Sequence, residues 1–517
     1  MAPSIGAGRA RQRQTREHLP PLPAPATPGL QIEALSVDDW ASRAVSLRRR
    51  DGTSFVDLFA GPVDPDGGIA LTLLLARHEK GDWIALRDVL PRGATYPSLS
   101  AALPAADWYE REVFETHRLV PLGHPHLRPL GHSADDTADR LLADSPLEPA
   151  STGVVDYPLG PVRAGIVESG HYTLRTVGEE IVDARLQLAY KHRGIESMAT
   201  TIDPALLPVL AERISGTDAV AHGLACSMAL ESLTGQRVSA RAHALRLIAA
   251  ELERLHDHAA FQAELCQATG LVVAQAQFEI VRERLLRLAA RLTGHRFLFG
   301  FVLPGGVATD FDQDAIADLL RTVSEARGDL SWLGGMTSAS GSHLDRLRGT
   351  GRVSLDDASG LALTGPVARA AGLDVDARRD APYGAYAATP LSIPLAEVGD
   401  AAARSTVRLQ EAIIAADLIL AIAAELPDGP AAVAPTPVGV GPLPARMAAL
   451  GWAEGSRGTE VHWVETDSEG RIARYRVRSA SFACWQGFAR SIPGGNILTD
   501  FPIIEQSFGL SYAGSDR

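Results

Sequence analysis

Two long stretches of helical periodicity limit what this chain can fold into. Across residues 238–292, apolar side chains recur three and four positions apart, and the pattern is interrupted near Thr269 and Gly270. Residues 401–424 predict another long helix. Helices with apolar residues at this spacing bury them against neighbouring elements, so the sequence predicts a helical bundle.

Shorter segments with strand character lie before and after these helices. Apolar or alternating runs bounded by glycine, proline and aspartate predict strands at 54–59 and 68–75. Hairpins are predicted across 172–188 and 461–477, and a helix near 99–114. The sequence therefore predicts an α+β fold, in which an N-terminal α/β domain precedes a domain with a central helical bundle and peripheral β-hairpins.

Composition sets two segments apart from the rest of the chain. Residues 1–29 combine arginines with a proline cluster and almost nothing to bury, which predicts a disordered tail, with a targeting segment as the alternative. Residues 131–152 are rich in Asp, Ser and Pro and predict a linker. We therefore expect folded domains at 30–130 and 153–517.

Charge and hydropathy exclude two kinds of partner. The 517 residues carry a formal net charge of −13, which argues against binding nucleic acid. The most apolar stretch, residues 412–424, includes Asp417 and is only thirteen residues long. A membrane-spanning helix needs about twenty apolar residues, so we expect a buried helix here and no transmembrane segment.

Cysteine usage argues against disulfides and iron–sulfur clusters. The chain has no Cys-x-x-Cys pair, and its cysteines are Cys226, Cys266 and Cys484. Three cysteines at irregular spacing suit a reducing compartment, and clusters are usually held by four thiolates. We expect the three to be small buried apolar residues.

Two segments far apart in the sequence carry a resemblance to a known family. Residues 213–222 read Arg-Ile-Ser-Gly-Thr-Asp-Ala-Val-Ala-His. With residues 509–517, they resemble the metal-binding ends of nickel-iron hydrogenase large subunits, where Arg-x-Cys-Gly-x-Cys-x-x-x-His and Asp-Pro-Cys-x-x-Cys supply the thiolates. The residues at the thiolate positions are Ser215, Asp218, Ser511 and Gly514. The framework residues retained are Arg213, Gly216, His222 and Arg517.

The replaced thiolates argue against a metal centre. Nickel held with iron needs soft, deprotonated sulfur ligands, and hydroxyls, a carboxylate and a glycine cannot replace them. The hydrogenase-like subunit of respiratory complex I shows the same loss of thiolates, and its vacated space serves a quinone. The resemblance therefore implies a cavity without metal, and we expect this chain to hold no metal and no cluster of its own.

A second resemblance lies ahead of the predicted linker. Residues 107–112 and 123–128 resemble the signature of the small partner subunit of complex I, with Glu115 at the family's aspartate and Arg118 at its usual glycine. A partner domain fused ahead of a hydrogenase-like domain is the arrangement of formate hydrogenlyase and hydrogenase-4 large subunits. Taken alone, residues 107–112 favour a capped helix end with surface ion pairs.

Two further segments carry charged residues that the resemblance places at the cavity. His-Arg-Gly-Ile-Glu at 192–196 resembles a segment whose glutamate has a proton-relay role, and an acid favoured by the helix dipole is the alternative for Glu196. Arg378, after the Gly-Pro turn at 365–372, matches the arginine of a cavity segment, with a solvated charge run as the alternative. His-Asp-His at 256–258 is not expected to bind metal, because residues two apart on a helix point in nearly opposite directions.

The resemblance thus assigns two groups of residues to the cavity. The candidate catalytic residues are Glu196, Asp218, His222 and Arg378. The candidate cofactor-binding residues are His192, Arg193, Arg213 and Arg517. Such groups in a partly desolvated cavity suit proton supply to a reduced quinone and stabilisation of its anion. Beside Arg213, Asp218 would act as an ion-paired filler or as a proton donor.

The function implied is that of a subunit in a membrane-associated oxidoreductase complex related to NADH-quinone oxidoreductase, hydrogenase-4 and formate hydrogenlyase. It would lie on the cytoplasmic side of the membrane and pass electrons from a 4Fe-4S cluster in a small partner subunit to an acceptor, a quinone by resemblance, while membrane-embedded subunits translocate ions. The alternative is a non-catalytic structural subunit, because the quinone-holding tyrosine of the family aligns with Gly216. We also expect residues 508–517 to pack against 213–222, and Arg517 to be the encoded last residue.

Washed, purified protein should contain no nickel and no iron, because none of the four thiolate positions carries sulfur. Elemental analysis by mass spectrometry checks this directly. Stoichiometric nickel that survives washing would contradict the ligand argument.

Overall fold

The described part of the chain has seven ranges. The computed structural model describes residues 22–63, 67–77, 80–128, 130–131, 153–163, 168–431 and 443–517. Most of the predicted linker, residues 132–152, lies outside the described residues, and so does the predicted tail up to residue 21.

The last part of the predicted disordered tail is ordered. Strand β1, Ala24–Pro25, pairs in parallel with β13, Met447–Glu454. The Thr27 hydroxyl donates to the Leu450 carbonyl at 2.8 Å and accepts from the Leu450 N–H at 2.7 Å. The prediction of disorder is therefore wrong for residues 22–29, because hydrogen bonds to a distant strand hold this segment without a large apolar contribution.

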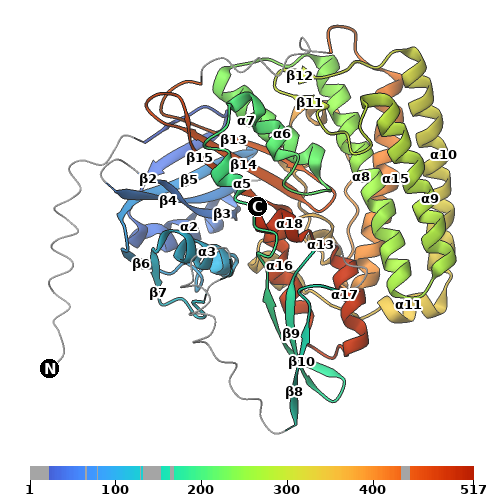
Figure 1. Ribbon diagram of the computed structural model, residues 1–517, viewed down its shortest axis with the longest axis horizontal. Coiled ribbons are helices and arrows are strands. Elements are labelled where there is room, and N and C mark those ends of the chain that lie inside the picture. Colours follow the sequence, from blue (N-terminus) through green and yellow to red (C-terminus); the bar gives the residue numbers. More distant parts are fainter. Residues whose placement is uncertain are drawn as a thin grey trace.

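The N-terminal domain is a four-stranded sheet with two helices on one face (Figure 1). The strand order is β2–β5–β4–β3, with bounds Leu30–Ala34, Asp82–Pro91, Gly68–Arg77 and Thr53–Val63. The helices are α2, Val37–Asp51, and α3, Asp107–His117. Leu71 and Leu73 of β4 pack in the same core as the helices, whereas Leu74 packs with the larger domain. The two predicted strands are confirmed and are longer than expected.

The helix predicted near 99–114 begins later than expected. Pro104 opens a 3₁₀ turn, Pro104–Ala106, and α3 follows it. Arg118 ends α3 with a φ of +59° and donates its N–H to the Phe114 carbonyl. Glycine usually takes this left-handed conformation at a helix end, so Arg118 adopts the backbone shape of the glycine that the resemblance places there.

The predicted helical bundle is confirmed, and Figure 1 shows its long helices side by side. The four helices are α8, Ala240–Ala268; α9, Val272–Thr293; α10, Gln313–Ser338; and α15, Ala401–Ala424. The break near 269–270 falls where expected, and the Asp400 carboxylate caps α15 by accepting from the Ala403 N–H at 2.8 Å. Within the described ranges, no helix has both the length and the apolar character to cross a membrane.

A second sheet lies between the bundle and the N-terminal domain (Figure 1). It continues from β13 into β14, Thr459–Thr466, and β15, Ile472–Arg478, as the predicted hairpin requires. Helix α7, Ala219–Thr234, packs directly on it. At Gly451 of β13, an added Cβ would lie 1.8 Å from the Ala225 carbonyl oxygen, so only glycine allows this approach of helix and strand.

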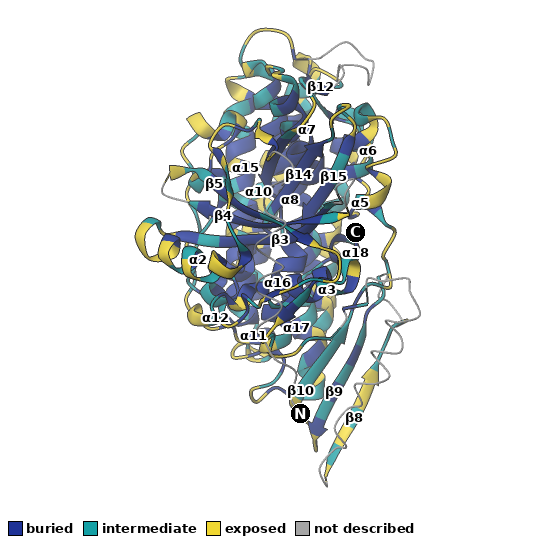
Figure 2. Ribbon diagram, turned by 90° about the vertical axis from the view of Figure 1, so that its left-hand side faces the viewer, coloured by how far each residue is buried: buried dark blue, intermediate teal, exposed yellow. Residues whose placement is uncertain are grey.

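A three-stranded sheet extends away from the body of the molecule (Figure 2). Its strands are β8, Val154–Leu159; β9, His171–Val177; and β10, Glu180–Gln187. The hairpin predicted across 172–188 is therefore confirmed. The remaining strands are β6, Thr95–Pro97; β7, Val120–Leu122; β11, Val302–Leu303; and β12, Gly306–Val307.

Short helices complete the larger domain. The earlier ones are α5, Ile195–Met198; η4, Pro204–Leu206; α6, Leu207–Ala211; α11, Gly341–Leu347; α12, Leu355–Gly360; α13, Gly365–Ala370; α14, Ala377–Asp380; and η5, Gly384–Ala388. The last ones are α16, Ala480–Ser491; η6, Leu498–Asp500; α17, Phe501–Phe508; and α18, Tyr512–Asp516. The Ser215 hydroxyl lies 3.1 Å from that of Ser511, which confirms that 508–517 packs against 213–222.

One arginine joins the two domains through buried ion pairs. The Arg476 guanidinium, on β15, makes two hydrogen bonds to Asp57 of β3 at 2.8 and 2.9 Å. It makes two more to Glu112 of α3 at 2.9 and 3.0 Å. All three side chains are buried. The charged residues of 107–112 therefore do not all form surface pairs, because Glu112 faces the larger domain.

Arg476→Met should lower the free energy of unfolding by about 3–5 kcal/mol, because it leaves two carboxylates buried beside too little positive charge. Chemical denaturation followed by circular dichroism measures the change. Arg471→Met is the matched control, since Arg471 lies on the same hairpin with 69% of its side chain exposed and should leave the midpoint unchanged. Equal midpoints for the two variants would contradict the role of Arg476.

Candidate functional site

Three of the four predicted thiolate positions lie together at the start of α18. Ser511 caps this helix by accepting from the Gly514 N–H at 3.0 Å, and its hydroxyl also contacts Ser215. A Cβ on Gly514 would lie 3.4 Å from Ser511 Cβ and 3.7 Å from Ser215 Cβ. The Gly216 that follows Ser215 is exposed, and an added Cβ there would meet open space.

The fourth position, Asp218, pairs with a residue that the sequence reasoning did not consider. Its carboxylate accepts from the Ser456 N–H at 2.6 Å and hydroxyl at 2.7 Å, and lies 3.1 Å from Arg457. The expected neighbour, Arg213, instead lies over the Phe299 ring with 48% of its side chain exposed. The arginine that pairs with Asp218 is therefore Arg457, on the turn between β13 and β14.

The donor set at these positions does not fit nickel. The Ser215 and Ser511 hydroxyls are hydrogen-bonded to each other. The Asp218 carboxylate accepts from Ser456 and pairs with Arg457, and Gly514 has no side-chain atom that could bind a metal. Among the described residues, no group of three or more His, Cys, Asp or Glu side chains is arranged to hold a metal ion. The side chains at the thiolate positions are therefore hydrogen-bonded or ion-paired within the protein.

A buried acidic cluster surrounds Arg457. Asp257 of α8 lies 3.7 Å from Arg457 and accepts a hydrogen bond from the Ser456 hydroxyl at 2.9 Å. Glu253, one turn earlier on α8, accepts from the first N–H groups of α7 at 2.9 and 3.2 Å. Burial, and then the charges of Asp257 and Asp218, raise the pKa of Glu253 well above its usual range. Burial and its acidic neighbours therefore favour the protonated form of Glu253.

Glu253 and Arg457 are the functional candidates that sequence reasoning missed. The available signal was the spacing of Glu253 and Asp257, four residues apart on one helix face. Neighbouring Glu168 was missed as well; it accepts from the Tyr512 N–H at 2.6 Å and lies 3.4 Å from the Ser511 hydroxyl.

His222 belongs to a buried row of neutral groups. Its Nδ1 lies 3.0 Å from His462 Nε2, and His462 Nδ1 lies 2.6 Å from the Tyr475 hydroxyl. At the other end, His222 Nε2 lies 3.7 Å from a Glu460 carboxyl oxygen. Burial lowers the pKa of His222 to about 4 and raises that of Glu460 well above its usual range. Burial therefore favours the neutral forms of His222 and Glu460.

Glu196 lies in an ion-pair cluster and not beside Asp218. Its carboxylate lies 2.8 Å from Arg474, 3.2 Å from Arg517 and 3.6 Å from Arg476. Burial alone would raise the pKa of Glu196, but these three arginines lower it. Arg517, a predicted cofactor-binding residue, also pairs with Glu112 and so contacts the N-terminal domain.

His192 and Arg193 fasten the C-terminal segment to the loop before α7. Arg193 donates to the Arg213 and Ile214 carbonyls at 2.7 and 2.6 Å, and His192 Nδ1 lies 2.7 Å from the Asp516 carbonyl. These predicted cofactor-binding residues therefore hold the two resembling segments together. Both side chains are largely exposed, next to the candidate site.

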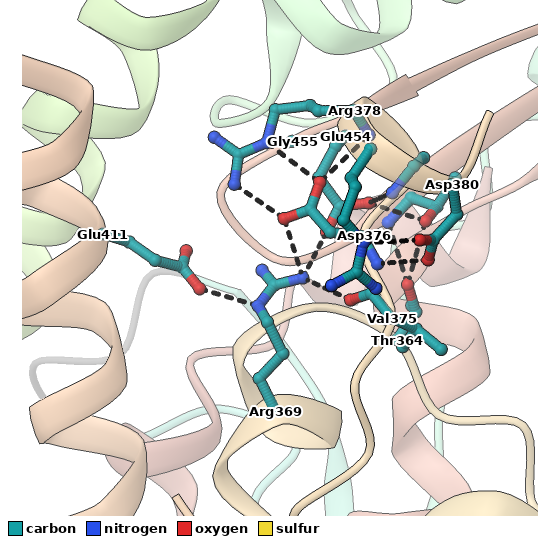
Figure 3. A network of polar contacts seen from close by, with 12 residues as sticks. Thr364, Arg369, Val375, Asp376, Arg378, Asp380, Glu411, Glu454 and Gly455 are labelled. Carbon is teal, nitrogen blue, oxygen red and sulfur yellow. Dashed lines mark hydrogen bonds and ion pairs between the residues drawn. The ribbon is translucent and has the colours of Figure 1, made fainter. Parts of the chain in front are cut away.

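Arg378 lies in a separate buried network (Figure 3). Its guanidinium donates to Asp376 at 2.7 Å and to Glu251 at 3.0 Å, and the neighbouring Arg369 pairs with Glu411 at 2.8 Å. The alternative of a solvated charge run is wrong for Arg378, which is 2% exposed. Its hydrogen bonds to two carboxylates give Arg378 a structural position away from Asp218.

The residues of the His-Asp-His segment have different partners. Asp257 faces Ser456 and Arg457, whereas His258 Nε2 lies 3.0 Å from Glu411. Residues 256–258 therefore do not converge on one ion, as the helix geometry predicts. The structure divides the predicted site residues among several networks instead of one cavity.

Comparison with known proteins places this arrangement in a family. Residues 269–450 match the family described as the 49 Kd subunit of respiratory-chain NADH dehydrogenase, and residues 35–148 match its 30 Kd subunit. The chain is 32% identical to formate hydrogenlyase subunit 5 of Escherichia coli, over 85% of this chain and 80% of that protein. The chain belongs to the family of formate hydrogenlyase subunit 5 and the C/D fusion proteins of NADH-quinone oxidoreductase.

Other members of the family are more distant. The C/D fusion protein of the NADH-quinone oxidoreductase of Rhodopseudomonas palustris is 28% identical, over 93% of this chain and 90% of that protein. A solved structure of the membrane-bound sulfane sulfur reductase, described as an archaeal respiratory membrane complex, superposes with a TM-score of 0.67 at 25% identity. It covers 71% of this chain and all of that chain. These relatives confirm the predicted fold class and the fused arrangement.

Glu212, at the edge of the candidate site, is a carboxyl group with a strongly shifted pKa. It is 2% exposed and accepts from the Gly300 N–H at 2.8 and 2.9 Å. Burial raises its pKa to about 7, although Gly300 and Arg213 oppose the shift. The folded state therefore keeps a proton on Glu212 that the unfolded state releases at lower pH.

Glu212→Gln should change how stability depends on pH. A raised carboxyl pKa contributes stability that is present below pH 4.5 and is lost as pH rises to about 7. The neutral amide has no such loss, so between pH 5 and pH 8 the variant should gain roughly 2–3 kcal/mol relative to wild type. Denaturation at both pH values measures this, and parallel pH profiles would contradict it.

Proposed function

We propose that this chain is the hydrogenase-like subunit of a membrane-associated oxidoreductase complex. Electrons arrive from a 4Fe-4S cluster in a small partner subunit and pass to an acceptor, a quinone being the class we favour, with ion translocation carried out by membrane-embedded subunits. The chain lies at the cytoplasmic side of the membrane. The support is membership of a family whose relatives are named as formate hydrogenlyase and NADH-quinone oxidoreductase subunits.

The observation that carries a catalytic role is the protonated Glu253 beside Asp218, Asp257 and Arg457. Reduction of a quinone consumes protons, and a general acid should hold its proton at the working pH. Burial, and then the charges of Asp257 and Asp218, favour the protonated form of Glu253. The cluster therefore suits proton delivery better than the binding of an anion.

The position of the cluster suits an acceptor that arrives from the outside. Arg457 keeps 17% of its side chain exposed, whereas Asp218 and Asp257 keep 2% and 4%. Gly216 leaves open space at the exposed loop, and Arg213 and Arg193 give this rim positive charge. An acceptor at this rim would contact the partly exposed Arg457 guanidinium first. Glu253, the proposed proton source, is more deeply buried, with 3% exposed.

Glu253→Gln should lower acceptor reduction by about 10²-fold or more, because the amide cannot donate the proton. Its single carbonyl oxygen can keep only one of the two hydrogen bonds from the Val220 and Ala221 N–H groups, so the free energy of unfolding should fall by roughly 1 kcal/mol. The assay uses the intact complex, with reduced viologen as donor and a short-chain quinone as acceptor. Glu283→Gln, a surface change on α9, is the matched control and should leave turnover unchanged.

A structural subunit is the second candidate. It is favoured by the hydrogen bond between Ser215 and Ser511 and by the ion pair of Asp218 with Arg457, which fill the thiolate positions with contacts inside the protein. Wild-type turnover in an assembled Glu253→Gln complex would support this alternative against the catalytic proposal.

A further inference from the structure

A cavity of about 350 Å³ lies at the junction of the two domains. One wall consists of β3, β4 and the start of β5, and the other of residues 359–381 with β14. Most of its apolar lining residues are buried, among them Val56, Leu75, Ala76, Leu103, Leu363 and Val461. Ligand sites of 300–1,000 Å³ occur preferentially at domain interfaces and are lined mainly by such residues.

A buried hydrogen-bond donor in this lining has no partner. Trp83 is 4% exposed, and its indole N–H makes no hydrogen bond to the protein. Other buried tryptophans are satisfied: the N–H groups of Trp40, Trp452 and Trp485 donate at 2.9, 2.8 and 2.7 Å. Buried donors are almost always paired, so the N–H of Trp83 requires an acceptor that the protein does not supply.

Four of the six charged residues of the lining are in ion pairs. The six are Arg48, Arg77, Asp82, Asp376, Asp380 and Arg478. Arg77 pairs with Asp82, and Asp376 with Arg378. Arg48 donates to Ser359, Asp380 pairs with Arg379, and Arg478 donates to two backbone carbonyls. Arg48 and Arg478 donate to neutral groups and keep their positive charge, so the preference for a neutral ligand rests on the mainly apolar lining and on the uncharged indole donor of Trp83.

We propose that this cavity binds a neutral, largely apolar molecule of one or two rings, which accepts a hydrogen bond from Trp83 through a carbonyl-type oxygen. The molecule contacts both domains at once, so its binding stabilises their junction by mass action. This site is separate from the Asp218 cluster, because neither Asp218, Glu253 nor Arg457 lines the cavity.

Benzophenone is a suitable probe, because it carries a ketone between two rings and forms covalent adducts with nearby C–H bonds under light. Labelling of the full-length protein should saturate, and peptide mapping should find adducts on both walls, in 53–83 and in 359–381. Trp83→Phe should weaken labelling about five-fold through loss of one hydrogen bond. Ala76→Phe, which fills the cavity, should abolish it while the melting temperature confirms folding.

Diphenylmethane, which has the rings without the oxygen, tests the hydrogen bond itself. As a competitor it should be about five-fold weaker than benzophenone against the wild type and no weaker against Trp83→Phe. Equal competition in the wild type would refute Trp83 as the donor. Labelling that does not saturate, or that both variants leave unchanged, would overturn the site and indicate a cavity that holds only water.

Discussion

The ion pairs of Arg476 with Asp57 and Glu112 are the contact on which the two-domain arrangement depends. Each carboxylate comes from a different element of the N-terminal domain, and loss of the arginine would leave Asp57 buried without this ion pair and Glu112 with Arg517 alone. Arg517 and Glu196 extend the same cluster to the C-terminal segment and the loop after β10. The junction therefore fixes the position of the candidate site relative to the N-terminal domain.

The parts of the fold predicted from the sequence are those with local causes. The periodicity of residues 238–292 and 401–424 predicted the long helices, and the alternation across 461–477 predicted the hairpin. The order of residues 22–29 could not be predicted, because it comes from pairing with β13, more than four hundred residues away. The proline content of this segment indicates that it would be disordered on its own. It carries no information about the distant strand with which the segment pairs.

The candidate site was predicted in part for a similar reason. Family motifs identified the contact between Ser215 and Ser511. They did not identify Arg457, which approaches Asp218 from a turn 239 residues later. The protonation of Glu253 depends on burial and on two neighbouring carboxylates, neither of which can be read from a helix pattern. Arg378 matched a motif, but its carboxylate partners are set by tertiary packing.

The distance along the chain between Asp57 and Arg476, 419 residues, has a consequence for synthesis. A ribosome adding about 5–20 residues per second needs roughly 20 to 80 s between the two. During that time Asp57 of the N-terminal sheet lacks its partner Arg476. The apolar face that contains Phe59 likewise lacks Trp463, against which it packs in the folded protein. The nascent chain therefore passes through a long interval in which this face is open to chaperones or to incorrect association.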